Sequence, residues 1–319
     1  MDLRQRTKGF SASVILCACI LRLGLMGLPM LLFPIYSETG RNVRFSSSSE
    51  KFLEHFRESP PPWLPTEEKI EFTSEDLSLV EMDYDCNLRP DLEALLIKPL
   101  EWDLKTDGPS VLILHTHTTE SYTRNGEEYP ESSAYRTLDE AYNMLSIGET
   151  VAERLEAAGI RVIHDRQIHD YPSYNGSYVH SRGVTEQILA ENPSIRLVLD
   201  LHRDAVEKEG KQIRPVVRNA QDGAAQMMMV VGTDSSRPNH VNWQENLALA
   251  LKLQVQLQRQ FPGIMRPVNL RAQRFNQDLS PGALLVEVGA AGNTRQEALA
   301  AANELAEAII AVSGGCNKG

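Results

Sequence analysis

Apolar residues recur in two alternating patterns from residue 110 to residue 312. Short apolar runs bounded by turn residues predict strands at 111–114, 160–163, 195–201, 227–232 and 283–288. Longer stretches with a period near 3.6 predict helices at 143–158, 178–192, 242–261 and 294–312. Strands that alternate with helices are typical of a mainly parallel sheet. We therefore expect an α/β fold with helices on both faces of the sheet, formed by residues 108–319.

The N-terminal segment has the pattern of a membrane anchor. A mostly apolar run of 28 residues, 9–36, follows Arg4, Arg6 and Lys8. It exceeds the roughly 20 residues that span a bilayer. Basic residues before it favour a cytoplasmic N-terminus, which places the remaining chain outside the cytoplasm. We expect residues 1–36 to be a cytoplasmic tip and a single transmembrane anchor in the cell membrane, with a cleaved signal peptide as the alternative.

Residues 37–107 have the composition of a linker. They contain four consecutive serines at 46–49, three consecutive prolines at 60–62 and many acidic residues. Such a composition favours extended or irregular chain over a packed core. We therefore expect an extracytoplasmic linker between the anchor and the folded domain, with room for short elements at 89–105.

Charge and cysteine content narrow the choice of function. The net charge is −11 and no cluster of Lys and Arg is suited to gripping phosphates, which argues against nucleic-acid binding. The four cysteines contain no CxxC pair, so neither a disulfide framework nor a thiolate zinc site is expected. Any bound metal has to be held by histidine and carboxylate side chains.

Polar residues follow or end three of the predicted strands. His117 and Glu120 come just after strand 111–114, His202 follows strand 195–201, and Glu287 ends an apolar run at 284–286. In an open α/β sheet, ligands bind beyond the carboxyl ends of the strands. We therefore expect these four side chains to meet at one edge of the sheet.

Two histidines and one glutamate form a ligand set typical of catalytic zinc, with water in the fourth position. We expect His117, Glu120 and His202 to hold Zn²⁺. Glu287 is then the general base that takes a proton from the water and passes it to the leaving group. Arg203 is a candidate for stabilising the negative charge that develops on the carbonyl oxygen.

Each of these residues also has a structural interpretation. A single histidine beside a strand is more often a hydrogen-bonded structural residue than a ligand. Glu287 could pair with Arg271 or Arg274 instead of taking part in catalysis. Alternation along an extended chain places His115 on the same side as His117, as a ligand, a hydrogen-bond donor to a ligand or a substrate contact.

Four segments in the same order carry a resemblance to a known family. They are HTHTTESY at 115–122, HDYPSYNGSY at 169–178, DLHRD at 200–204 and NQDLSPGALLVEVG at 276–289. Together they resemble the stage II sporulation protein P family, and the resemblance covers residues 110–312. That family is similar in turn to zinc-dependent N-acetylmuramoyl-L-alanine amidases.

The resemblance implies a function in bacterial endospore formation. Members of the family degrade septal peptidoglycan during engulfment by amidase and endopeptidase activity, and their partners are stage II sporulation proteins D and M. In the broader amidases the glutamate ligand comes near the start of the helix after the first strand, where Glu140 lies here. Glu120 and Glu140 are therefore alternative ligands, and Glu120 is preferred because it lies within the first matching segment.

The leading hypothesis is a zinc-dependent hydrolase that cleaves the amide between N-acetylmuramic acid and L-alanine in peptidoglycan. One alternative is a metallo-carboxypeptidase or endopeptidase that acts on wall peptides. Another is a wall-binding scaffold without activity.

Overall fold

The computed structural model describes residues 70–100, 103–123, 135–209, 211–217, 223–233 and 242–314. The predicted anchor at 9–36 lies outside these ranges. Within them, no helix is both long and apolar enough to cross a membrane. The described residues fall in one compact unit, Thr66–Gly319.

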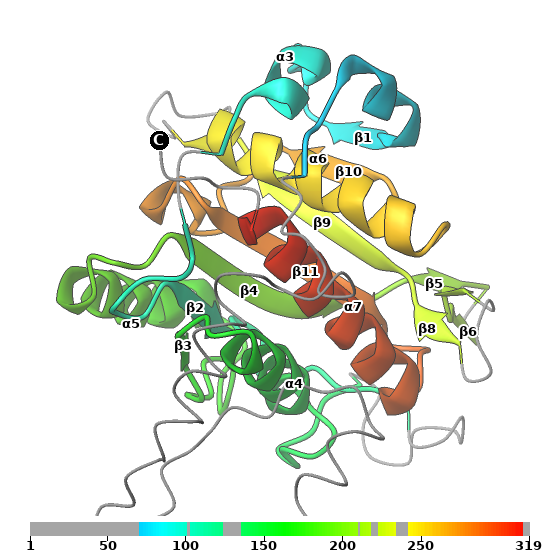
Figure 1. Ribbon diagram of the computed structural model, residues 1–319. Coiled ribbons are helices and arrows are strands. Elements are labelled where there is room, and N and C mark those ends of the chain that lie inside the picture. Colours follow the sequence, from blue (N-terminus) through cyan, green and yellow to red (C-terminus); the bar gives the residue numbers. More distant parts are fainter. Residues whose placement is uncertain are drawn as a thin grey trace, which may run out of the picture. The chain divides into compact units, whose positions relative to one another are not determined.

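A seven-stranded sheet forms the centre of this unit, in the order β1-β10-β9-β11-β4-β2-β3 (Figure 1). The strands are β1 (Met82–Asp85), β2 (Val111–Leu114), β3 (Val162–His164), β4 (Leu197–Asp204), β9 (Met227–Gly232), β10 (Val268–Arg271) and β11 (Ala283–Ala290). Every neighbouring pair is parallel except β11 with β9, which is antiparallel. The predicted mainly parallel α/β fold is thus confirmed.

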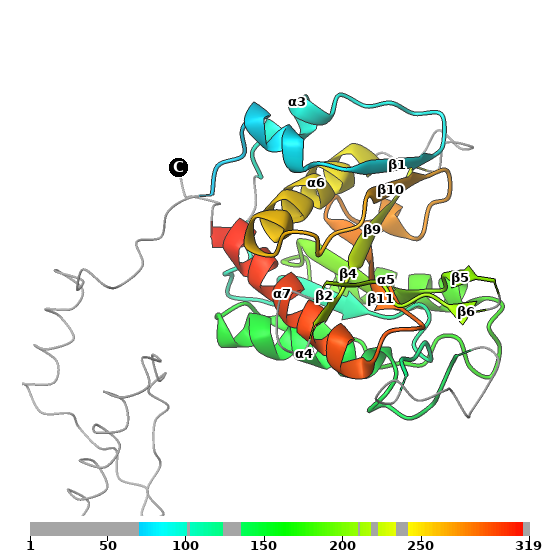
Figure 2. The same ribbon diagram turned by 90° about the vertical axis from the view of Figure 1, so that its right-hand side faces the viewer.

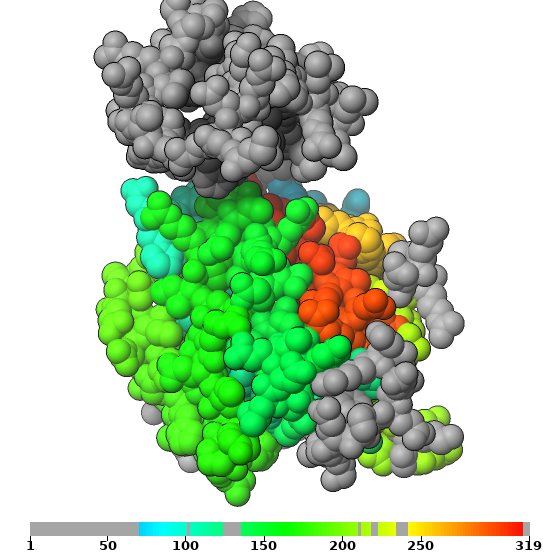
Figure 3. All heavy atoms as spheres, turned by 90° about the horizontal axis from the view of Figure 1, so that it is seen from below, coloured from blue at the N-terminus to red at the C-terminus, as the bar shows by residue number. Residues whose placement is uncertain are grey.

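Helices cover both faces of the sheet (Figure 2). On one face lie α4 (Met144–Ala157), α6 (Trp243–Gln260) and α7 (Arg295–Gly314), and on the other lies α5 (Ser177–Glu191). In the space-filling view of Figure 3, the green segment that contains α4 borders the orange-red segment that contains α7, and these two helices are in contact. Two small hairpins, β5–β6 (Glu207–Lys208 with Lys211–Gln212) and β7–β8 (Val216–Val217 with Ala224–Ala225), lie between β4 and β9 in the chain.

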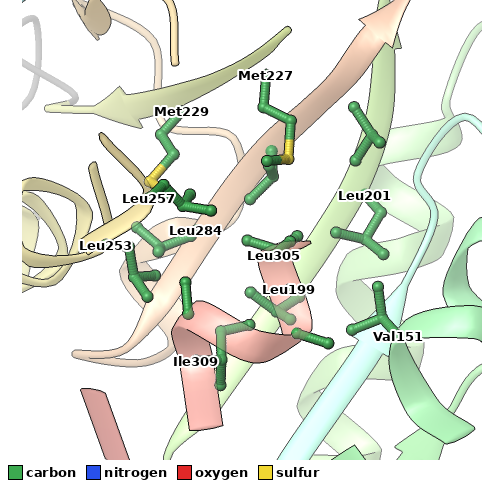
Figure 4. Packing of buried hydrophobic residues seen from close by; sticks show 14 of the residues in the cluster. Val151, Leu199, Leu201, Met227, Met229, Leu253, Leu257, Leu284, Leu305 and Ile309 are labelled. Carbon is green, nitrogen blue, oxygen red and sulfur yellow. The ribbon is translucent and has the colours of Figure 1, made fainter. Parts of the chain in front are cut away.

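The main hydrophobic core lies between the sheet and the three helices α4, α6 and α7. Figure 4 shows alternate residues of β4, Leu199 and Leu201, packed with Leu305 of α7 and Val151 of α4. Side chains alternate between the two faces of a strand. The intervening residues of β4 therefore point to the opposite face, where Val198 packs with residues near α5. This alternation decides on which face the polar residues of β4 and β11 lie.

The predicted elements are close to the observed ones, with two strands longer than expected. Strands 111–114 and 227–232 are confirmed, and all four predicted helices are present with small differences at their ends. Asn143 caps α4 by accepting a hydrogen bond from the amide of Leu145 at 3.0 Å. However, β4 continues to Asp204 and β11 to Ala290, so His202 and Glu287 lie inside strands rather than at their ends.

The described part of the predicted linker at 37–107 belongs to the folded unit, and only its short helix within 89–105 was anticipated. Within it, β1 pairs with β10 at the edge of the sheet, and α3 (Leu92–Ile97) packs against α6. Leu96 of α3 is fully buried in the main core. Elements of four and six residues are too short to show a clear period, which is why the acidic composition dominated the prediction. Residues 37–69 lie outside the described part.

Candidate active site

The candidate site lies on the α5 face of the sheet, where β4 and β11 run side by side. His202 of β4 and Glu287 of β11 are register partners in this parallel pair. Their neighbours Leu201 and Val286 pack in the main core on the opposite face. Since side chains alternate along a strand, His202 and Glu287 both point toward the α5 face.

The turn after β2 brings the other two predicted residues to the same place. Glu120 Oε2 lies 3.4 Å from Nδ1 of His202 and accepts a hydrogen bond from the backbone amide of Arg203 at 3.1 Å. The ring of His117 is edge-on to that of His202, with 5.2 Å between centroids. The structure thus brings His117, Glu120, His202 and Glu287 together, as predicted. Their individual roles stay predictions.

Two buried carboxylates fix the turn that carries His117 and Glu120. Asp200 accepts hydrogen bonds from the amide and hydroxyl of Thr116, at 2.8 and 2.6 Å. Asp170 accepts from the amide and hydroxyl of Thr119, at 3.1 and 2.7 Å. Charge-assisted hydrogen bonds of this kind are stronger than neutral ones. They hold the turn in one conformation over the sheet.

Asp200 also contacts His202, and the sequence analysis missed it. Its Oδ1 lies 2.9 Å from Nε2 of His202, but the contact lacks hydrogen-bond geometry and leaves Nε2 without a hydrogen-bond partner. The alternation of β4 contains the signal, since residues 200 and 202 have to face the same side. Carboxylates next to ligand histidines commonly fix the orientation of the ring.

His117 is enclosed by residues of the segment that leads into α5. The hydroxyl of Tyr174 lies 3.1 Å from Nε2, and the hydroxyl of Ser177 lies 3.3 Å from Nδ1. The ring of Tyr174 stacks on the imidazole with 4.5 Å between centroids, and that of Tyr178 lies edge-on at 5.5 Å. These aromatic neighbours were not predicted as site residues.

Arg136 links several parts of the site and was also missed. Its guanidinium lies 3.4 Å from Oε1 of Glu120, forms an ion pair with Asp170 and sits over the ring of Tyr174, 4.6 Å from the centroid. It comes from an irregular segment before α4, where spacing in the sequence gives no signal.

Arg203 makes its contacts within the protein. Its Nε and one terminal nitrogen donate to the carbonyls of Ser121 and Tyr135, at 3.3 and 2.7 Å, and its other terminal nitrogen lies 3.9 Å from Glu120 Oε1. These contacts give Arg203 a role in positioning the turn. Its contribution to stabilising an oxyanion stays a prediction.

The geometry separates two pairs of alternatives from the sequence. Glu140 is exposed and pairs with Arg166 at 2.6 Å, whereas Glu120 lies against His202, and the choice of Glu120 as metal ligand stays a prediction. The alternative in which Glu287 pairs with Arg271 or Arg274 is not observed, because those arginines pair with Asp85 and Asp278 and one oxygen of Glu287 has no hydrogen-bond partner.

The predicted position of His115 beside His117 is also wrong. The chain turns at residues 116–119, so the alternation of an extended strand does not continue. His115 Nε2 lies 2.9 Å from Nε2 of His164, and its Nδ1 lies 3.1 Å from the carbonyl oxygen of Leu201. His115 therefore supports the sheet from the α4 side, where Gly148 leaves room for both rings.

Several acidic and basic side chains of the site have pKa values far from their ordinary ones. Burial, together with the nearby carboxylates of Glu120 and Asp204, outweighs the opposing effect of His202 and raises the pKa of Glu287 to about 8. Burial would also raise the pKa of Glu120, but Arg203 and His202 outweigh it and lower the value to about 2. Burial lowers the pKa of His117 to about 4. Such clusters of perturbed groups are typical of functional sites.

His202 differs from the other imidazole of the site. Burial disfavours its charged form, but Asp200 and Glu120 more than compensate and hold its pKa well above the ordinary value for histidine. The pKa of Asp200 is lowered, because His202 and the hydrogen bonds from Thr116 outweigh the effect of burial. The two carboxylates thus favour positive charge at the position of His202.

The chemistry of the site fits a zinc ion, although its present arrangement is incomplete. Imidazole nitrogen and carboxylate oxygen are common zinc ligands. Nε2 of His202 and Oε2 of Glu287 are buried without hydrogen-bond partners. Yet no group of three or more His, Cys, Asp or Glu side chains in the described ranges is placed so that it could hold a metal as it stands. Tyr174 and Ser177 engage both nitrogens of His117 in this arrangement.

Comparison with known proteins gives a family for the chain. The family model described as "Stage II sporulation protein P (SpoIIP)" matches residues 47–310. The stage II sporulation protein P of Bacillus subtilis (strain 168) is 29% identical over 287 residues, which cover 86% of this chain and 66% of the relative. The chain thus spans slightly less than two thirds of the length of that relative.

Solved structures of amidases show a more distant likeness. The N-acetylmuramoyl-L-alanine amidase of Clostridium difficile 630 aligns with a TM-score of 0.39 and 15% identity, over 64% of this chain and 94% of its own. The CwlD amidase of Clostridioides difficile, solved in complex with the GerS lipoprotein, aligns with a TM-score of 0.38 and 13% identity, over 64% and 95%. At this level the likeness carries no argument about activity.

Proposed function

Because the chain belongs to the stage II sporulation protein P family, we propose that it is a zinc-dependent peptidoglycan hydrolase that cleaves the amide between N-acetylmuramic acid and L-alanine. The observation that carries the proposal is the meeting of His117, Glu120 and His202 next to Glu287 on one face of the sheet. Wall peptides with cleavable cross-links are a second class of substrate for the same chemistry.

His117, Glu120 and His202 are the proposed ligands. Bound zinc would polarise the amide carbonyl and lower the pKa of a water molecule to about 7. Asp200 lies 2.9 Å from Nε2 of His202 and fixes the turn through Thr116, and Asp170 with Arg136 keeps Glu120 in place through the same turn. A ligand set held by strands and a hydrogen-bonded turn is preorganised for binding.

Glu287 is the proposed general base and acid. Its carboxyl lies beside His202 in a fixed strand and has one oxygen without a partner. It would take a proton from the attacking water and deliver it to the amine of L-alanine as the amide bond breaks. The other residues of β11 carry no charge or hydrogen-bonding side chain, so the half-buried carboxyl of Glu287 needs a reason to be there.

The family and the sequence pattern support a setting for this activity. We place the catalytic unit outside the cytoplasm, attached to the cell membrane by the apolar segment at 9–36. Its substrate is septal peptidoglycan during engulfment, and its partners are stage II sporulation proteins D and M. Nucleic acid is not a partner, because the chain is acidic.

Removal and return of metal test the proposal. The purified full chain is stripped with a chelator, then supplied with Zn²⁺, and mixed with intact peptidoglycan. We expect one zinc per chain, loss of peptide release after stripping, and recovery with Zn²⁺. Release of peptides that does not depend on metal would contradict the zinc mechanism, and zinc-loaded protein that releases nothing would indicate a scaffold.

A further inference from the structure

Buried side-chain hydrogen bonds lead from helix α5 to the candidate site. The hydroxyl of Ser181, in the second turn of α5, lies 2.8 Å from the hydroxyl of Thr116 in the turn after β2. Thr116 in turn donates to Oδ2 of Asp200 at 2.6 Å. Ser181 and Thr116 are both fully buried. The two hydroxyls thus join a helix, a turn and strand β4 away from solvent.

The hydrogen bond between the two hydroxyls can point in only one direction. A hydroxyl has a single hydrogen, and that of Thr116 goes to the carboxylate of Asp200, which only accepts while it is ionised. Ser181 is therefore the donor in its short bond to Thr116. The carbonyl oxygen of Tyr178, another acceptor near the hydroxyl of Ser181, is more distant at 3.5 Å.

Asn276 extends these bonds into the loop before β11. Its side-chain amide donates to the hydroxyl oxygen of Ser181 at 3.3 Å and to the carbonyl oxygen of Tyr178 at 2.8 Å. Each side chain thus donates to the next one, in the direction of Asp200. Successive hydrogen bonds that point the same way polarise and strengthen one another.

Asp200 is the member of this series that meets a proposed ligand. Its Oδ2 accepts from the hydroxyl of Thr116, and its Oδ1 lies 2.9 Å from Nε2 of His202. We propose that Ser181 is a positioning residue for His202, acting through Thr116 and Asp200. The inference rests on the proposed function, because His202 is one of its three zinc ligands. Groups that hold a ligand's neighbours in place change metal affinity without touching the metal.

The zinc affinity of the full chain tests the inference. Competition with a zinc indicator is measured for the unaltered protein and for Ser181→Ala, together with urea unfolding in the absence of metal. We expect Ser181→Ala to weaken Zn²⁺ binding by about three- to tenfold, the scale of one buried hydrogen bond. A hydroxyl that only stabilises the fold would change the unfolding midpoint and leave the zinc affinity of the folded chain unaltered.

A double variant shows whether Ser181 acts through Asp200. In a chain that already carries Asp200→Asn, the carboxylate at the end of the series is gone. Ser181→Ala should then weaken zinc binding by less than twofold, because coupled residues are not additive. The same three- to tenfold loss in both backgrounds would contradict the path through Asp200.

Ser313 gives a matched control. It is also a buried helical serine whose hydroxyl donates to the carbonyl three residues earlier, that of Ile310, at 2.9 Å. It lies in α7, on the opposite face of the sheet. Ser313→Ala should therefore bind zinc like the unaltered protein. If Ser181→Ala does not fold, Ser181→Cys takes its place, because a thiol keeps the side chain but is only a weak donor.

The possible outcomes separate this inference from the proposed function. Unchanged zinc affinity in the Ser181 variants would overturn the positioning role even if the unaltered protein binds zinc and releases peptides from peptidoglycan. A loss of affinity that depends on Asp200, in a protein that releases no peptides, would support the positioning role and contradict the proposed hydrolysis. An unaltered chain that binds no zinc would contradict both.

Discussion

His202 and Glu287 are register partners on the adjacent parallel strands β4 and β11, with both side chains on the α5 face. This relationship places an imidazole and a carboxyl side by side on two central strands of the sheet. Opposite side chains in neighbouring strands lie close together, and strands hold a site more firmly than loops do. The proposed roles, with His202 as ligand and Glu287 as base, require the two groups to be neighbours in this way.

Glu287→Gln should separate metal binding from catalysis. Glutamine has nearly the same shape but cannot accept the proton from water, so we expect zinc content to stay unchanged while turnover falls by about 10²–10⁴-fold. Zinc analysis and peptide release from peptidoglycan, measured on one preparation, check this. A purified variant that retains full activity would remove Glu287 from the proposed role.

His202→Ala should lose both zinc and activity, because it removes one of three proposed ligands. The matched control is His180→Ala. His180 is exposed on α5, and its Nδ1 lies 3.2 Å from the carbonyl oxygen of His169. Metal analysis after dialysis should find zinc in the control and none in the His202 variant. A normal zinc content in the His202 variant would exclude it as a ligand.

Asp200→Asn should weaken zinc binding without abolishing it. The carboxylate contacts His202 and holds Thr116, so its loss leaves the ligands present but less well oriented. Residues of this kind typically change metal affinity by about 10- to 100-fold. A competition titration with a zinc indicator measures the change. An unaltered affinity would show that Asp200 supports the fold alone.

Two glycines should respond to alanine in opposite directions. A Cβ at Gly232, the last residue of β9, would lie 2.8 Å from the carbonyl oxygen of Arg274 and closer still to that of Gln273. Since backbone has to shift, we expect Gly232→Ala to destabilise the fold by about 1–3 kcal/mol or more. Gly183 is exposed within α5 with no atom near its Cβ, so Gly183→Ala should stabilise by about 0.5–1 kcal/mol. Urea unfolding of both variants measures the difference, and equal effects would contradict the packing of β9.

Lys252 should make stability depend on pH in the alkaline range. Burial and, to a lesser extent, Lys98 lower its pKa to about 8, while its amine donates to the carbonyl of Leu95 at 3.1 Å. In the unfolded chain the pKa is about 10.4, so between pH 8 and 10 the unfolded state binds more protons and this residue's contribution to stability rises with pH. The free energy of unfolding of the unaltered protein should therefore rise relative to that of Lys252→Met across this range. Parallel pH curves for the two proteins would contradict the shift.

Much of the fold could be predicted because its central elements are long or strongly apolar. Strands β2 and β9 and the helices α4, α5, α6 and α7 show clear periods and end at recognisable residues such as Gly159, which has a φ of +83°. The meeting of the four candidate residues could also be predicted. They lie in or just after β2, β4 and β11, which are neighbours in the parallel sheet, and they are His117, Glu120, His202 and Glu287.

The remaining features depend on contacts that spacing does not encode. β1 and β10 are only four residues each, too short to show a clear period. The antiparallel pairing of β11 with β9 depends on how the chain runs through α6 and β10 between them, which the spacing of residues does not show. Arg136 and Tyr174 reach the site from irregular segments, so only the folded chain reveals them. Asp200 is the exception, since its position two residues before His202 in β4 indicates a shared face.

The identity of the bond that is cleaved tests the central claim most directly. The zinc-loaded full chain is incubated with intact peptidoglycan, and the products are identified by mass spectrometry together with labelling of new amino termini. The account predicts released peptides that begin with a free L-alanine amine, and glycan strands that have lost their stem peptides. New amino termini only within cross-links, with L-alanine still joined to the sugar, would contradict it.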